Sequence, residues 1–211
     1  MPSSLSTLET LVRKGLGGRD DSAANTVIDA CINYSATLAA LLFEPPELLT
    51  QANLTVLANN SNVSLSTLTR HLSIKSVYNS TNSTKMWYIP WETWEAVIPA
   101  NVGSTKYFSI LGETLYVKDT PSANKTLSVG YNTYPSTMSN SNDTVSFDYH
   151  DSFIVSAAIG IARAFFDKAD TGKAMDTIIL PLSLGAKARQ IIEGQRTSFE
   201  TLLTSLQTKG A

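Results

Sequence analysis

The apolar residues of this chain recur at helical spacing toward both ends and alternate with polar residues in the middle. Over 22–42 an apolar residue falls at every third or fourth position, which predicts one long amphipathic helix. Pro45-Pro46 ends it, because proline cannot continue a helix. The capping box Ser6-Thr7-Leu8-Glu9 predicts a shorter helix before it, ending at Gly15 to Gly18.

The middle of the chain carries the patterns of strands. Apolar and polar residues alternate over 54–57 and 72–78, as in half-buried strands. The run 107–117 predicts a tight hairpin with Gly112 at the first central position of its turn. A third strand is expected over 126–131, which would complete an antiparallel meander.

Helical spacing returns at Asp151, after a polar loop, and continues with interruptions to Gln207. Gly194 weakens the last helix by about 1 kcal/mol relative to alanine. We therefore expect an α+β fold, with an antiparallel helical bundle, an inserted antiparallel β domain and a C-terminal helical or extended segment. The expected boundaries are 1–49 for the N-terminal helices, 50–147 for the β domain, 148–185 for the second half of the bundle and 186–211 for the C-terminal segment.

Charge is sparse and nearly balanced. The chain has 16 Lys and Arg against 18 Asp and Glu, and charged residues make up only 16% of it. A protein that binds DNA through the phosphate groups of the duplex would carry an excess of basic residues on one element, and no long basic cluster occurs in this sequence. Near-neutrality is compatible with a passage through which DNA slides.

Candidate chemistry is also sparse. His71 and His150 stand apart without metal-ligand spacing, and we interpret both as surface or capping residues. Cys31 lies on the apolar face of the long helix with no activating neighbour, which favours a buried structural residue. Gly15 to Gly18 lacks the sequence of a phosphate loop. We therefore predict no enzyme activity, no cofactor and no metal.

An aromatic cluster precedes the hairpin and has two interpretations. Its members are Trp87, Tyr88, Trp91, Trp94 and Tyr107. Such rings can stack on sugars or bases, or they can fix the β insertion against the helices. The second interpretation is favoured. The backbone of this segment is expected to be a short helix or an irregular run.

No membrane segment is expected. The longest apolar stretch, around Leu38 to Phe43, is shorter than the roughly 20 residues of a membrane span. The first nine residues lack the basic start and apolar run of a signal peptide, which indicates folding in a cytoplasm.

The hairpin at 107–117, followed by Thr126-Leu127-Ser128-Val129-Gly130-Tyr131 and Pro135, resembles the core of tailed-bacteriophage adaptor proteins. The alanine-rich helix at 150–167 and the long first helix followed by Pro45-Pro46 agree with that family in order. The resemblance implies a structural virion protein of the phage neck, assembled in the host cytoplasm.

It further implies a ring, usually of twelve copies, that binds the portal protein and the next tail component. Genomic DNA would pass through its channel without sequence-specific binding. The interrupted C-terminal helix is either an ordinary bundle helix or the segment that docks on the portal. For docking, the expected contact residues are Arg189, Arg196, Phe199 and Leu202.

Two other hypotheses stay open. In the first, the chain belongs to the same neck as a stopper or tail-completion protein. Alternatively, the aromatic cluster makes it a carbohydrate-binding module of a host-recognition device.

Overall fold

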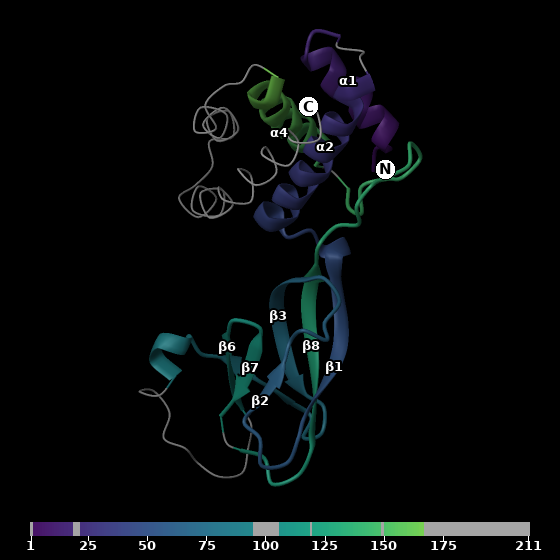
Figure 1. Ribbon diagram of the computed structural model, residues 1–211. Helices are drawn as coiled ribbons and strands as arrows, with labels where there is room; N and C mark the ends of the chain where they lie inside the picture. The colour runs from purple at the N-terminus through teal and green to yellow at the C-terminus, as the bar shows by residue number, and fades with distance from the viewer. Residues whose placement is uncertain (1, 19–21, 95–105, 119, 149, 167–211) are drawn as a thin grey trace. The chain divides into compact units, whose positions relative to one another are not determined.

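The computed structural model describes residues 2–18, 22–94, 106–118, 120–148 and 150–166 (Figure 1). They form two compact units. The β unit is Leu49–Tyr134, and the helical unit joins Met1–Leu48 to the chain that follows from Pro135. The described elements are α1 (Leu5–Gly15), α2 (Ser22–Phe43), η1 (Pro46–Leu48), β1 (Leu49–Val56), β2 (Asn62–Ser64), β3 (His71–Asn79), β4 (Thr84–Lys85), β5 (Trp87–Tyr88), η2 (Trp91–Thr93), β6 (Tyr107–Leu111), β7 (Thr114–Val117), β8 (Lys125–Thr133) and α4 (Asp151–Phe166).

Helix α2 begins and ends as its periodicity predicts, and each of the three described helices packs against the other two. Its apolar face is buried, with Ile28, Cys31, Ile32 and Leu38 fully inaccessible to solvent. By length and composition alone, Ala24–Phe43 is able to cross a membrane, contrary to the sequence estimate. Half of that stretch is buried inside the protein, and a core helix of the same composition meets the same criterion.

The predicted N-terminal cap of the first helix is wrong by two residues. The helix starts at Leu5, and the Ser4 hydroxyl, not that of Ser6, accepts the hydrogen bond from the Thr7 amide at 3.4 Å. The reason is tertiary: the Leu5 amide donates to the Asp143 carbonyl at 2.8 Å and the Ser6 amide to the Ser141 carbonyl at 3.1 Å. The predicted end of the helix is confirmed at Gly15.

The segment 135–147, which was expected in the β domain, hydrogen-bonds to the helices. Besides the contacts with the start of α1, Asn33 of α2 holds the backbone of Met138. Its side-chain nitrogen donates to the Met138 carbonyl at 2.9 Å, and its side-chain oxygen accepts from the Met138 amide at 2.8 Å. The polar character of this segment therefore reflects its own turns and its contacts with α1 and α2.

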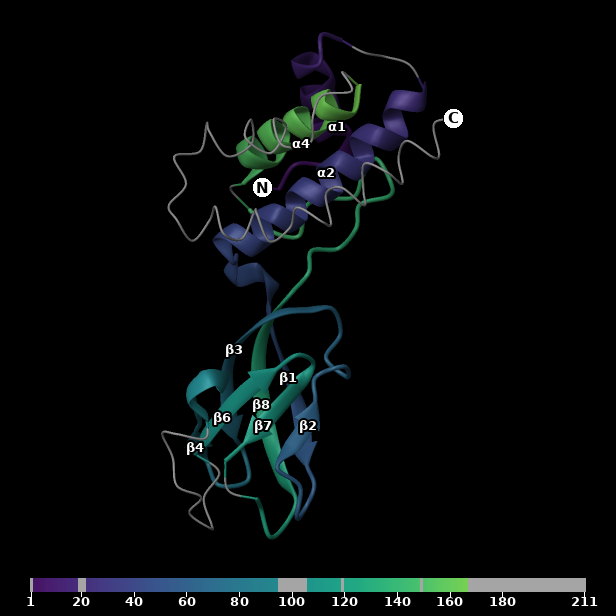
Figure 2. The same cartoon turned by 60° about the vertical axis from the view of Figure 1, so that its left-hand side comes forward.

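Two four-stranded sheets make up the β unit, in the orders β1-β8-β3-β4 and β2-β7-β6-β5 (Figures 1 and 2). The hairpin β6–β7 is confirmed, and Gly112 adopts a φ of 56°, a conformation that costs glycine little. The predicted meander is wrong, because β8 lies between β1 and β3 in the other sheet. The expectation of purely antiparallel pairing is also wrong at one place, since β5 pairs with β6 in parallel.

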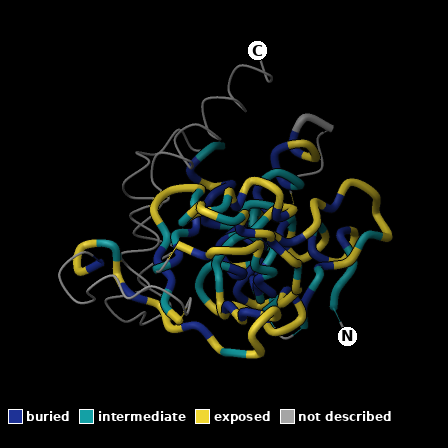
Figure 3. The backbone as a smooth tube through the Cα atoms, turned by 90° about the horizontal axis from the view of Figure 1, so that it is seen from below, coloured by how far each residue is buried: buried dark blue, intermediate teal, exposed yellow. Residues whose placement is uncertain are grey.

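Inward-facing residues of both sheets form one core, and the buried positions are dark blue in Figure 3. Leu115, Leu127, Val56 and Val129 are fully buried at its centre. The mixed α+β class expected from the sequence is thus confirmed, with three described helices and two sheets that are mainly antiparallel.

Candidate functional site

The aromatic cluster divides into a packed part and an exposed part. Trp91 stacks on Trp94 with ring centroids 6.3 Å apart and contacts Tyr116 of β7 at 4.7 Å. The Lys118 ammonium lies 5.4 Å from the centre of the Trp94 ring. Trp94 is only 7% exposed. These rings pack against strands of their own unit and stabilise it.

Trp87 and Tyr88 of β5 form the exposed part, with 61% and 55% of their surfaces open to solvent. The Lys85 ammonium lies 5.5 Å from the centre of the Trp87 ring. The Trp87 amide donates to the Lys106 carbonyl at 2.8 Å, so the backbone of Lys106, a second exposed lysine, lies beside β5. We call Lys85, Trp87, Tyr88 and Lys106 the basic aromatic edge. The sequence pattern marked these rings but did not separate the exposed from the buried ones.

A concavity of about 540 Å³ lies on the outer face of the sheet β1-β8-β3. Gly130 deepens it, because a Cβ there would come within 2.6 Å of the Ser76 hydroxyl. Gln51 donates a hydrogen bond to Ser128 across the strands. Leu49 and Tyr78, both partly exposed, lie at its rim. The hollow is lined mainly by uncharged hydrogen-bonding and apolar groups, with Lys75 its one basic residue.

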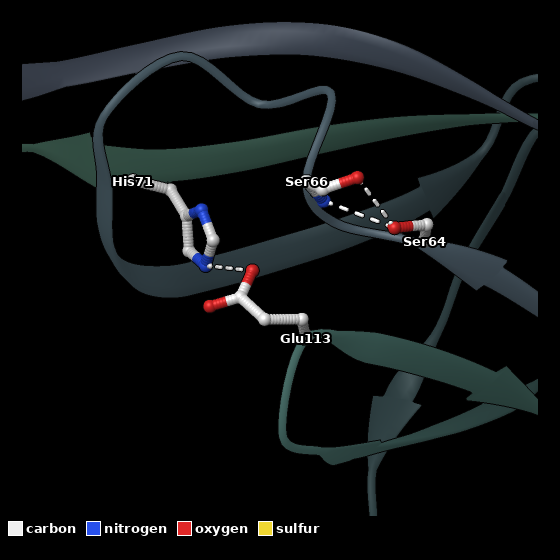
Figure 4. A network of polar contacts seen from close by, with 4 residues as sticks. All are labelled: Ser64, Ser66, His71 and Glu113. Carbon is white, nitrogen blue, oxygen red and sulfur yellow. Dashed lines mark hydrogen bonds and ion pairs between the residues drawn. The ribbon is translucent and has the colours of Figure 1, made fainter.

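His71 and Glu113 form an ion pair with 3.7 Å between Nε2 and Oε2 (Figure 4). Ser64 and Ser66 lie nearby, but their hydroxyls hydrogen-bond to each other at 2.7 Å. A serine nucleophile needs a hydrogen bond to its base, and none joins these described serines to His71. The pair connects the start of β3 to the β6–β7 turn, in keeping with a structural histidine.

His150 and Cys31 both lie within the helical unit. The imidazole of His150 stacks on Phe43 with centroids 4.5 Å apart, and Phe43 meets Phe153 edge-on at 5.2 Å. Cys31 is fully buried, and desolvation raises the pKa of its thiol to about 12. A thiol with such a pKa is not a nucleophile at neutral pH. Both residues act in packing.

Asp29 of α2 has the most perturbed carboxyl pKa among the described residues. Its pKa is raised from 3.8 to about 6. Burial is the largest cause, the hydrogen bond with Glu9 on α1 and the charge of Glu9 also raise it, and the charge of Arg13 lowers it. A second carboxylate beside a half-buried one favours the protonated form. The contact between α1 and α2 is therefore strongest when Asp29 carries its proton.

We expect Asp29→Asn to stabilise the protein at pH 7 by about 1 kcal/mol, a value reduced for solvent screening of a half-buried group. Folded Asp29 holds a proton up to about pH 6, whereas the unfolded carboxyl releases it near 3.8. Its stabilising contribution is complete below pH 3.8 and is lost as the pH rises to 6. Urea unfolding at pH 4 and pH 7 measures this, and the variant's advantage should disappear at pH 4.

Asp143→Asn is the matched control. Hydrogen bonds from the Ser139 and Asn140 amides lower the pKa of Asp143, so its contribution is present above the unfolded value and lost as the pH falls. An equal gain in both variants at pH 7 would contradict the assignment to Asp29.

Two further expectations concern a metal site and the portal-binding residues. Within the described ranges, no group of three or more His, Cys, Asp or Glu could hold a metal ion. The four residues expected to bind the portal lie outside the described residues, namely Arg189, Arg196, Phe199 and Leu202.

The chain belongs to the SU10 adaptor protein family, whose sequence model matches residues 3–194. This is a family of phage head-to-tail adaptors, so the resemblance drawn from the hairpin and its flanking helices is confirmed. No individually curated protein matches the chain. Family membership gives the chain a structural role in the phage neck and argues against an enzymatic one.

Proposed function

We propose that this chain is one subunit of the adaptor ring that joins the portal of a tailed phage to its tail and continues the DNA channel. The observation that carries the proposal is the family match, which runs through both units from residue 3 to residue 194. A ring of twelve copies, assembled in the host cytoplasm and needing no membrane, is the form we propose.

The charge of the chain supports a channel through which DNA moves. With a net charge of −2, the subunit has no large basic excess that would hold the duplex by its phosphates. DNA would then pass without sequence-specific binding. The helices that precede the β unit in the sequence and those that follow it would form one bundle, into which the β unit is inserted.

The C-terminal segment 186–211 is the proposed portal-docking element. Two of its residues, Arg196 and Phe199, are of types that are enriched at protein interfaces. The full chain with Arg196→Ala and Phe199→Ala should bind purified portal about 30-fold more weakly, as expected for the loss of interface hot spots. Lys168→Ala, which lies before this segment, should bind as the wild type does.

Surface-immobilised portal measures the binding, and electron microscopy of the complex shows whether it is a ring. A protein that binds only the tail component and not the portal would be a stopper or tail-completion protein of the same neck. A chain that stays monomeric with portal present would refute the adaptor proposal.

A further inference from the structure

The basic aromatic edge lies where both sheets of the β unit end. β4 is the terminal strand of one sheet and β5 that of the other, and only Met86 separates them. The backbone of 84–88 therefore passes in succession along two sheet edges that no other described strand covers. Such edges readily receive another chain unless something covers them.

The edge is held rigidly although its side chains are exposed. Met86 and Ile89 on either side of the exposed rings are 2% and 9% exposed. The Met86 amide donates to the Val77 carbonyl and the Ile89 amide to the Phe108 carbonyl, each at 2.9 Å. A backbone that is already ordered lowers the entropy lost on binding. Tryptophan and tyrosine are also among the residue types enriched in interface hot spots.

The two units carry opposite charge. Over 49–134 the sequence has six basic residues and four acidic ones, namely Arg70, Lys75, Lys85, Lys106, Lys118 and Lys125 against Glu92, Glu95, Glu113 and Asp119. Over the rest of the chain, 1–48 and 135–211, it has ten basic residues and fourteen acidic ones. The basic unit of one copy therefore complements the acidic unit of another.

We propose that the basic aromatic edge of one copy docks on the acidic helical unit of a second copy. This rests on the proposed ring, in which neighbours meet through two different surfaces and rotation closes the assembly. Lys85 and Lys106 supply the charge that steers the contact, and Trp87 and Tyr88 supply the apolar surface that it buries.

The end of α2 is the part of the helical unit that matches the edge best. Its last turn contains no basic residue, and the helix dipole is negative there. Glu44 and Glu47 follow at exposed positions, and Phe43 is 40% exposed beside them. This end thus places two exposed carboxylates, together with the exposed side of the Phe43 ring that stacks on His150, where the lysines and aromatic rings of the next copy would meet them.

Charge reversal in the full chain tests the contact. Sedimentation analysis, with portal added if the chain needs it to assemble, measures self-association of the wild type and variants. Lys85→Glu with Lys106→Glu should weaken it by about tenfold or more, and Glu44→Lys with Glu47→Lys should do the same. The matched control is Lys75→Glu with Lys125→Glu, which makes the same change in net charge elsewhere in the β unit and should leave self-association intact.

Mixing the two reversed variants is the decisive measurement, because each then supplies the charge that the other lacks. Recovery of hetero-association in the mixture supports the contact. Rings that form normally with the edge reversed, or that weaken equally in the control, would overturn this inference and leave the adaptor function standing. Failure of the wild type to assemble even with portal would instead refute the ring.

Discussion

Leu127→Ala is expected to destabilise the β unit by about 3 kcal/mol. The residue is fully buried in the middle strand β8, where it pairs with Leu54 of β1 and Asn79 of β3. Truncating a buried leucine removes its transfer free energy and leaves a cavity that close-packed neighbours cannot fill, at a cost of roughly 2–5 kcal/mol. Because β8 is paired on both sides, its backbone has little freedom to move into the space.

Tryptophan fluorescence reports this change. All three tryptophans of the chain, at positions 87, 91 and 94, belong to the β unit, and Trp94 is buried in it. Urea unfolding followed by fluorescence should show an earlier midpoint for Leu127→Ala. Leu111→Ala makes the same chemical change at a residue of β6 that is 47% exposed, and its midpoint should move little. Equal shifts for the two variants would show that burial at Leu127 does not set the stability.

The helices were predictable because their signals are local. The apolar stripe of α2 and the prolines after it lie within one stretch of sequence, and both ends of the helix were placed correctly. The start of α1 was misplaced because it depends on the carbonyls of Ser141 and Asp143, which come from a segment far along the chain. Only tertiary structure brings these acceptors to the helix.

Strand identity was predictable, but strand neighbours were not. The alternation over 126–131 located β8, and its place in the sequence after the hairpin suggested pairing with that hairpin, as consecutive strands usually pair. Its true place between β1 and β3 is reflected in Ser128 and Asn132, which are buried although they alternate with the core residues Leu127, Val129 and Tyr131. Burial on both faces is typical of a central strand, and composition does not reveal it.

The candidate interaction surface was predictable only in part. The sequence shows the aromatic cluster, but exposure separates Trp87 from Trp94, and exposure follows from tertiary packing. Lys106 is far from Trp87 in sequence and lies beside it because β5 pairs with β6. The separation of charge between the two units also becomes visible only once the unit boundaries are known.

Asn33→Ala is expected to destabilise the helical unit by about 2 kcal/mol. The side chain makes two hydrogen bonds to the backbone of Met138, a residue that is 2% exposed. Alanine leaves an amide and a carbonyl without these partners, and an unsatisfied buried group costs about 1–3 kcal/mol. The higher helix propensity of alanine, worth up to roughly 0.7 kcal/mol, offsets a part of this loss.

Ellipticity at 222 nm follows this change, since the described α-helices all belong to the helical unit. Asn25→Ala gives the same gain in helix propensity on α2 but removes only an exposed acceptor for Arg13, so its stability should stay within about 0.5 kcal/mol of the wild type. If Asn33→Ala and Asn25→Ala unfold at the same urea concentration, the contact with Met138 does not hold segment 135–147 to α2. If the ellipticity midpoint of Asn33→Ala moves while its tryptophan midpoint stays, the two units unfold separately, because Asn33 and the tryptophans lie in different units.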